Sequence, residues 1–334
     1  MTTRPTTRRQ FLATTTLATT GVALGFARRA RAATPKVKLG WLKNAIHHTT
    51  FVQLAKLSEK YGFAVELVDF VRYSDVMLAL QQRQVEFGGM GYAQLPSIIE
   101  QNMTNVRAIA GNMMGAVDVI MRTGVKLEQW KDYEGKKIAV PANSLAEHHV
   151  RVNAVEHGYD INKVEIIKML PGPAALISLK QGEIDGISAW EPWIAQAVVQ
   201  GIGYVPKLRV FDNSIGSING VVGASKSFAE ENRDLTVRFL KALVESNAWL
   251  MKNPEEHVKL ALTFMPIERT VALKAIENFS YDEKIYMKQT RVYARVMHQY
   301  GLTKIDTSDR VHEAVDYSFL EAATGKNRTD LGMA

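Results

Sequence analysis

Several turns in this sequence combine residues that suit the start of a helix with residues that suit the capture of a small anion. Asn143 and Ser144 are strong helix-capping residues, and Pro192 is typical of the first helical turn. The glycines of residues 88–91 (GGMG) allow the backbone to approach a ligand closely. Each helix start offers unpaired N–H groups and partial positive charge. Turns of this kind that converge would bind a small anion without using Lys or Arg.

Aromatic side chains accompany these turns and suit the wall around an apolar part of a ligand. Trp41, Tyr92, Trp190 and Trp193 each lie at or just beyond the end of a predicted strand. Core packing is the competing interpretation for Trp41 and Trp193. It is also the competing interpretation for one of the two methionines at positions 113 and 114.

Two histidine pairs and one glutamate supply titratable groups. The pairs at 47–48 and 148–149 suggest a metal site, but adjacent side chains point apart on a helix or strand, and no His-x-x-x-His pattern accompanies them. We therefore predict no metal and no cofactor, and we consider a hydrogen bond from one histidine to a ligand as the alternative role. Glu191 either complements the dipole of the helix that follows it or pairs with an ammonium group of a zwitterionic ligand.

The elements that must position these residues alternate between strands and helices from residue 36 onward. Val37, Leu39 and Trp41 alternate as on a half-buried strand, and helical spacing follows until Gly62. Further short strands are predicted at 63–67, 85–89, 106–110, 117–121, 137–141, 164–169 and 184–189. Strands separated by helices predict parallel-type sheets flanked by helices. Residues 255–322 are predicted to be helical throughout.

An internal repeat and the chain length both favour two lobes. Residues 80–87 (LQQRQVEF) align with residues 179–186 (LKQGEIDG) at an offset of 99, and each segment is predicted as a helix end, a turn and a short strand. The chain has 334 residues, which is long enough for two lobes.

The absence of Cys from the sequence excludes disulfides, thiol catalysis and Cys-ligated metals. No nucleotide-binding or hydrolase motif occurs either.

The net charge of +7 comes almost entirely from the first 32 residues, which hold six Arg and no acid. The remainder is close to neutral, so we predict no nucleic-acid partner. Thr7-Arg8-Arg9-Gln10-Phe11-Leu12 resembles the twin-arginine export motif, and an uncharged stretch too short and polar for a membrane span follows it. We predict that residues 1–32 are a signal peptide, cleaved after Ala32, and that the twin-arginine export machinery carries the folded protein to a bacterial periplasm.

The mature chain resembles the periplasmic substrate-binding proteins of ABC importers in the taurine, alkanesulfonate and nitrate group, which are related to the thiamine-precursor-binding family. The segments that carry the resemblance are residues 36–41 (KVKLGW), 85–91 (VEFGGMG), 133–141 (YEGKKIAVP) and 179–192 (LKQGEIDGISAWEP). The resemblance implies an α/β fold of the type 2 binding-protein class, with two lobes joined by two crossover strands near 117–123 and 218–223. The implied lobes are residues 33–119 with 221–334, and residues 120–220.

The implied binding site lies between the lobes. The residues predicted to contact the ligand are Trp41, Asn44, His47, His48, Tyr92, Asn112, Met113, Asn143, Ser144, His148, Trp190, Glu191 and Asn219.

The predicted function is capture rather than chemistry. We expect a monomeric, non-enzymatic periplasmic protein that closes on a small organic anion or zwitterion, such as a sulfonate or taurine, and delivers it to an ABC permease and its ATPase. One alternative is a flat aromatic or pyrimidine-type ligand stacked between Trp41, Tyr92 and Trp190. The other is a periplasmic enzyme, because twin-arginine export often serves enzymes that carry cofactors.

Overall fold

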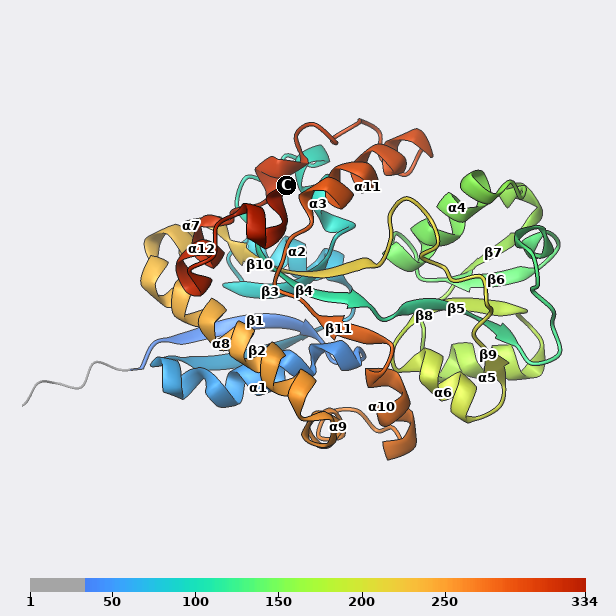
Figure 1. The fold of residues 1–334 in the computed structure, drawn as a ribbon, viewed down its shortest axis with the longest axis horizontal. Helices are drawn as coiled ribbons and strands as arrows, with labels where there is room; N and C mark the ends of the chain where they lie inside the picture. Colours follow the sequence, from blue (N-terminus) through green and yellow to red (C-terminus); the bar gives the residue numbers. More distant parts are fainter. Residues whose placement is uncertain (1–33) are drawn as a thin grey trace, which may run out of the picture. The chain divides into compact units, whose positions relative to one another are not determined.

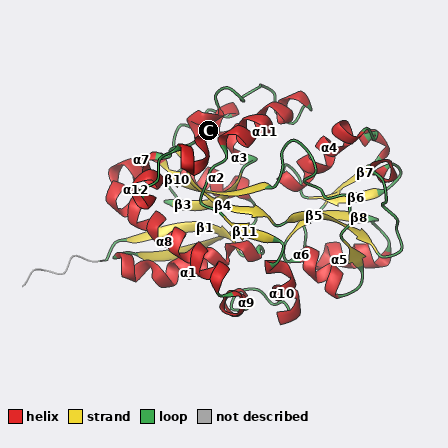
Figure 2. Cartoon of the chain, in the orientation of Figure 1, coloured by secondary structure: helices red, strands yellow, loops and turns green. Residues whose placement is uncertain are grey.

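The computed structural model describes residues 34–334, whose strands form two separate sheets (Figures 1 and 2). The predicted signal peptide lies outside the described residues. The first sheet has the order β11-β4-β10-β3-β1-β2 and the second the order β7-β6-β8-β5-β9. The strands of the first sheet are β1 (Lys36–Leu42), β2 (Ala64–Phe70), β3 (Phe87–Gly91), β4 (Val106–Gly115), β10 (Ile218–Ser225) and β11 (Phe279–Tyr281). Those of the second are β5 (Val117–Arg122), β6 (Lys137–Val140), β7 (Glu165–Lys168), β8 (Gly186–Trp190) and β9 (Gly203–Tyr204).

Helices pack on both sheets and make up most of the long C-terminal segment (Figure 1). Their bounds are α1 (Thr49–Leu57), α2 (Tyr73–Gln81), α3 (Gln94–Glu100), α4 (Leu145–His157), α5 (Pro173–Gln181), α6 (Trp193–Val199), α7 (Lys226–Glu231), α8 (Arg233–Lys252), α9 (Pro254–Ala261), α10 (Arg269–Ile276), α11 (Met287–Gln299) and α12 (Ser318–Thr324). A 3₁₀ turn follows α1, and Gly62 ends it in the left-handed conformation (φ 72°), as predicted. Within residues 34–334, none of the helices combines the length and apolar character that a membrane crossing requires.

The sequence predicted the two-sheet α/β architecture correctly, but both sheets are mixed rather than parallel. In the first sheet β10 runs antiparallel to β3 and β4, and in the second β5 runs antiparallel to β8 and β9. A parallel neighbour needs a crossover connection of a dozen or more residues. Only Ala116 separates β4 from β5, so the chain passes directly from one sheet into the other without such a crossover.

The prediction that residues 255–322 are helical throughout is wrong in part, because β11 interrupts them and pairs with β4 at the edge of the first sheet. Its three residues have the burial pattern buried, exposed, buried. A pattern with a period of two over three residues is too short to stand out from the helical spacing around it.

The second sheet shows how side-chain alternation builds the core. Val117, Val119 and Met121 of β5 enter the apolar cluster that α4 covers, whereas Ile120 enters the cluster that α5 and α6 cover. Successive side chains of a strand point to opposite faces, so one strand serves two cores. The two layers of helices hold the loops at the strand ends in fixed positions.

Candidate functional site

A cavity of about 280 Å³ lies between the two sheets, where loops from both meet. Its volume is at the lower end of the range of small-molecule sites. The first sheet and its helices supply Leu42, Ala45, His47, Val71, Arg72, Tyr73, Ser74, Gly91, Ala93, Gln94 and Asn219. The second supplies Val117, Pro141, Ala142, Asn143, Ser144, Leu145, Ala146, Lys168, Met169, Leu170 and Trp190. Most of these residues follow the carboxyl end of a strand, which is where open α/β sheets place their ligands.

The structure brings five of the predicted site residues together around this cavity. They are His47, Asn143, Ser144, Trp190 and Asn219. They come from both sheets, so the prediction of a site between the two halves agrees with where the cavity lies.

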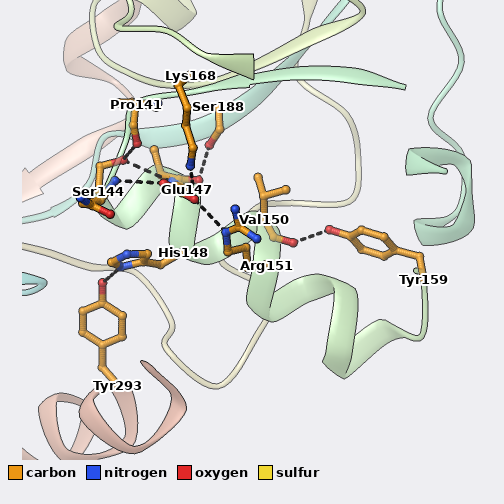
Figure 3. Close-up of polar contacts among 12 residues, drawn as sticks. Pro141, Ser144, Glu147, His148, Val150, Arg151, Tyr159, Lys168, Ser188 and Tyr293 are labelled. Carbon is orange, nitrogen blue, oxygen red and sulfur yellow. Dashed lines mark hydrogen bonds and ion pairs between the residues drawn. The ribbon is translucent and has the colours of Figure 1, made fainter. Parts of the chain in front are cut away.

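The start of α4 forms one wall of the cavity, and its capping groups are already engaged with each other (Figure 3). The Ser144 hydroxyl donates to the carbonyl of Pro141 (2.6 Å) and accepts from the Glu147 N–H (3.3 Å). The Glu147 carboxylate accepts from the N–H of Asn143 (2.9 Å), the residue before the helix cap. Part of the expected anion-binding capacity of this helix start is therefore used within the protein.

Two cations line the cavity instead, Arg72 from the first half and Lys168 from the second. The Lys168 ammonium pairs with the buried Glu147 carboxylate, which also accepts from Arg151 Nε (2.8 Å; Figure 3). Burial raises the pKa of Glu147, but the bonds from Lys168, Arg151 and the Asn143 N–H outweigh burial and leave the pKa below its ordinary value. Arg72 is exposed at the start of α2. No Asp or Glu side chain is among the described residues that line the cavity.

A chain of hydrogen bonds determines which ring nitrogen carries the proton in His47 and in His48. Burial lowers the pKa of His47 to about 3 and that of His48 well below its ordinary value, so both rings are neutral at pH 7. His48 Nδ1 accepts from the Leu42 N–H (2.8 Å), so its proton is on Nε2, which donates to the Tyr73 hydroxyl (3.2 Å). Tyr73 then donates to His47 Nε2 (2.8 Å), which places the His47 proton on Nδ1. Residues 34–334 contain no cluster of three His, Asp or Glu side chains that could hold a metal ion.

The model of the NMT1-like family matches residues 30–264, which is most of the chain.

The chain belongs to the NMT1-like family. It is 25% identical over 205 residues to the taurine-binding periplasmic protein of Escherichia coli K12, a match that covers 60% of this chain and 62% of that protein. The chain thus matches less than two thirds of the length of this relative. The resemblance inferred from the sequence is confirmed at the level of the family.

Solved structures of distant sequence share the two-lobed fold. The alkanesulfonate-binding protein SsuA of Xanthomonas axonopodis pv. citri, solved with MOPS bound, superposes with a TM-score of 0.72 at 16% identity, covering 86% of this chain and 100% of that one. The periplasmic nitrate-binding protein NrtA of Synechocystis PCC 6803 gives a TM-score of 0.73 at 15% identity, covering 88% and 89%. These likenesses support the predicted fold class.

Three of the residues predicted to contact the ligand in this member of the NMT1-like family, Trp41, Tyr92 and Met113, do not line the cavity. Trp41 is buried, donates to Asp69 (2.7 Å) and packs edge-on against Phe264. The buried Tyr92 donates to the Lys284 carbonyl (3.3 Å), and Met113 belongs to an apolar cluster with α9 and α10. The three-ring wall expected from the sequence therefore does not form, since Trp190 is its single member at the cavity.

The remaining predicted polar residues also lie away from the lining. They are Asn44, His48, Asn112, His148 and Glu191. Glu191 is fully buried, and its carboxylate accepts from the Ala195 N–H of α6 (3.0 Å) and from Asn278 at the end of α10. Burial raises the pKa of Glu191 to about 8. Of the two roles considered for this glutamate, the structure shows the capping role at a helix start.

Sequence reasoning missed the loop after β2 and the end of β7. The missed lining residues include Arg72, Tyr73, Ser74, Gln94 and Lys168. A signal existed for Arg72, Tyr73 and Ser74, because they lie a few residues beyond the strand predicted at 63–67. Lys168 lay inside a predicted strand, where a cation is usually read as solvent-facing.

Proposed function

We propose that this protein is the periplasmic solute-binding component of an ABC importer, and that it captures a small organic anion of the sulfonate type in the cavity between its sheets. The observation that supports this most is the charge of the lining, which within residues 34–334 includes Lys168 from one half, Arg72 from the other, and no carboxylate. Cations from both halves attract a ligand that carries a single concentrated negative charge.

The electrostatic balance near the cavity favours an anion even though Lys168 is paired. Glu147 carries one negative charge, and two cations, Lys168 and Arg151, share it. This group is therefore positive by one charge, and Arg72 adds a second positive charge to the cavity lining. The apolar lining, with Val117, Leu145 and Trp190 among its members, suits the hydrocarbon part of such a ligand.

The cavity is large enough for a ligand of this size. Its 280 Å³ corresponds to roughly nine water molecules at about 30 Å³ each. A small sulfonate has about seven heavy atoms, and at a ceiling of about 1.5 kcal/mol per atom its binding free energy reaches roughly −10 kcal/mol, which is a submicromolar Kd. Near-complete enclosure is required for this, so both sheets must contact the ligand.

The cellular setting is part of the same proposal. Residues 1–32 serve as a twin-arginine signal peptide, and the mature protein is a periplasmic monomer that delivers its ligand to a membrane permease. Its lobes are residues 33–119 with 221–334, and residues 120–220. The sequence motif at Arg8–Arg9 and the periplasmic relatives support these points.

Isothermal titration calorimetry with a panel of small sulfonates and carboxylates tests the proposal. Arg72→Gln and Lys168→Gln should each weaken binding of the best ligand by about ten-fold or more, since each removes a charge-assisted contact. Lys163→Gln is the matched control, because Lys163 pairs with Glu134 and is absent from the cavity lining. Absence of heat across the panel, or equal binding by all three variants, would contradict the proposal.

A further inference from the structure

Helix α4 has two buried faces that belong to different halves of the molecule. Ala146, Val150 and Ala154 pack in the apolar cluster of the second sheet. Leu145 and Val152 pack in the large cluster of the first sheet, together with residues of α11. The helical spacing places positions 145, 148 and 152 on one side and 146, 150 and 154 on another. Helix α4 therefore bridges the two halves at a place other than the crossover strands.

A hydrogen bond lies in the middle of the face that contacts the first half. His148 Nδ1 and the Tyr293 hydroxyl of α11 are 2.5 Å apart, and both side chains are buried (Figure 3). Burial lowers the pKa of His148 to about 4 and raises that of Tyr293, so the bond joins two neutral groups at pH 7. A buried neutral group that loses its only partner incurs a desolvation penalty, so separation of the two helices is costly here.

This contact is adjacent to the cavity. The residues immediately before His148, from Ser144 to Ala146, line the cavity, and Glu147 holds the lining residue Lys168. Movement of α4 away from α11 would therefore displace one wall of the cavity and one of its two cations.

We propose that His148 and Tyr293, with Leu145 and Val152, form a clasp that holds the α4 wall of the cavity against the first half of the molecule and must open for the cavity to open. His148 and Tyr293 are positioning residues, which act on the ligand through α4. The consequence for ligand exchange rests on the proposed function, but the clasp itself does not depend on the identity of the ligand.

Thiol labelling of the ligand-free protein tests the clasp, because the sequence has no Cys. Val152→Cys places a single thiol on the clasp face, and Val150→Cys places one on the opposite face of the same helix. Both valines are almost completely buried, at 0% and 1% exposed. We expect the thiol at 152 to react faster than the thiol at 150, because clasp opening exposes the first and global unfolding is needed to expose the second.

Tyr293→Phe removes the hydroxyl while keeping the ring. We expect it to accelerate labelling at position 152 by about three- to ten-fold, as for the loss of one hydrogen bond, and to leave labelling at 150 unchanged. Tyr133→Phe is the matched control, since the buried Tyr133 hydroxyl has no hydrogen-bond partner among the described residues. It should change neither rate.

Equal labelling rates at 150 and 152 in the otherwise unaltered protein would overturn the clasp even if Tyr293→Phe failed to fold. Equal acceleration of both positions by Tyr293→Phe would also overturn it, because a general loss of stability exposes both faces. If only the proposed function failed, the labelling rates at 150 and 152 would still differ as expected for the clasp, but calorimetry would detect no binding of an organic anion.

Discussion

Glu191→Gln offers a quantitative test of how the two halves are joined. The carboxyl group is buried, accepts from Ala195 in the second half and Asn278 in the first, and has its pKa raised from 4.5 to about 8 by burial. A carboxyl whose pKa is raised by folding gives stability that is fully present below pH 4.5 and is lost as the pH rises toward 8. The folded protein therefore carries a penalty at neutral pH that the variant lacks.

The size of the effect follows from the two pKa values. The difference between 4.5 and about 8, at about 1.36 kcal/mol for each pH unit, comes to roughly 4–5 kcal/mol when fully developed. The Gln side chain keeps one acceptor oxygen and replaces the other with an NH2 group. The loss of that acceptor lowers the free energy of unfolding by about 1–3 kcal/mol at all pH values. Glu191→Gln should therefore be less stable than the unaltered protein at pH 5 and more stable at pH 8, with a change in relative stability of about 3 kcal/mol between them.

Urea unfolding at pH 5 and pH 8, followed by circular dichroism, measures this difference. The exposed Glu128, whose side chain is 77% accessible, gives the control variant Glu128→Gln, for which we expect no reversal of sign. Groups other than Glu191 titrate in both proteins and cancel in the comparison. A relative stability of Glu191→Gln that stays constant from pH 5 to pH 8 would refute the reasoning, because Glu191 would then be ionised in the folded protein.

Three further predictions concern the ligand, acid stability and export. Propane-1-sulfonate should bind more tightly than taurine, because the two have equal size and the part of the chain that the structure describes offers no lining carboxylate to pair with the ammonium of taurine; calorimetry that shows taurine to be tighter would contradict this. Burial lowers the pKa of His47, His148, His149 and His257 from 6.5 to between about 3 and about 4. The stability that these neutral rings contribute should therefore be complete above pH 6.5 and fall toward pH 4 by about 1.4 kcal/mol per pH unit for each histidine, and together the four histidines outweigh the opposite change from Glu191. A flat urea-unfolding profile from pH 6.5 to pH 4 would be inconsistent with neutral buried rings. N-terminal sequencing of the exported protein should begin at Ala33, and Arg8→Lys with Arg9→Lys should abolish export; a mature protein that begins elsewhere would show that the cleavage prediction is wrong.

The sequence predicted the fold well because its strands are short, regular and separated by clear helical patterns. Residues 36–41 and 184–189 are examples, and both lie at strands of the structure. The direction of β5 and β10 was not predictable from periodicity, since alternation of side chains is the same in parallel and antiparallel strands. The strand β11 was too short to give a signal.

The candidate site was predicted in part. The helix-start rules found Asn143 and Ser144, because capping depends on local chemistry. They could not decide which way a side chain points from a buried strand end, and Trp41 and Tyr92 point into the core. The partners that determine the role of Glu191 and His148 are Asn278 and Tyr293, which are 87 and 145 residues away in the sequence.

Native mass spectrometry of freshly purified protein tests the central claim most directly. The account predicts a co-purifying small organic anion that is lost on denaturation and is absent from the Arg72→Gln, Lys168→Gln double variant. A bound neutral or cationic molecule, or an anion retained equally by the double variant, would contradict it.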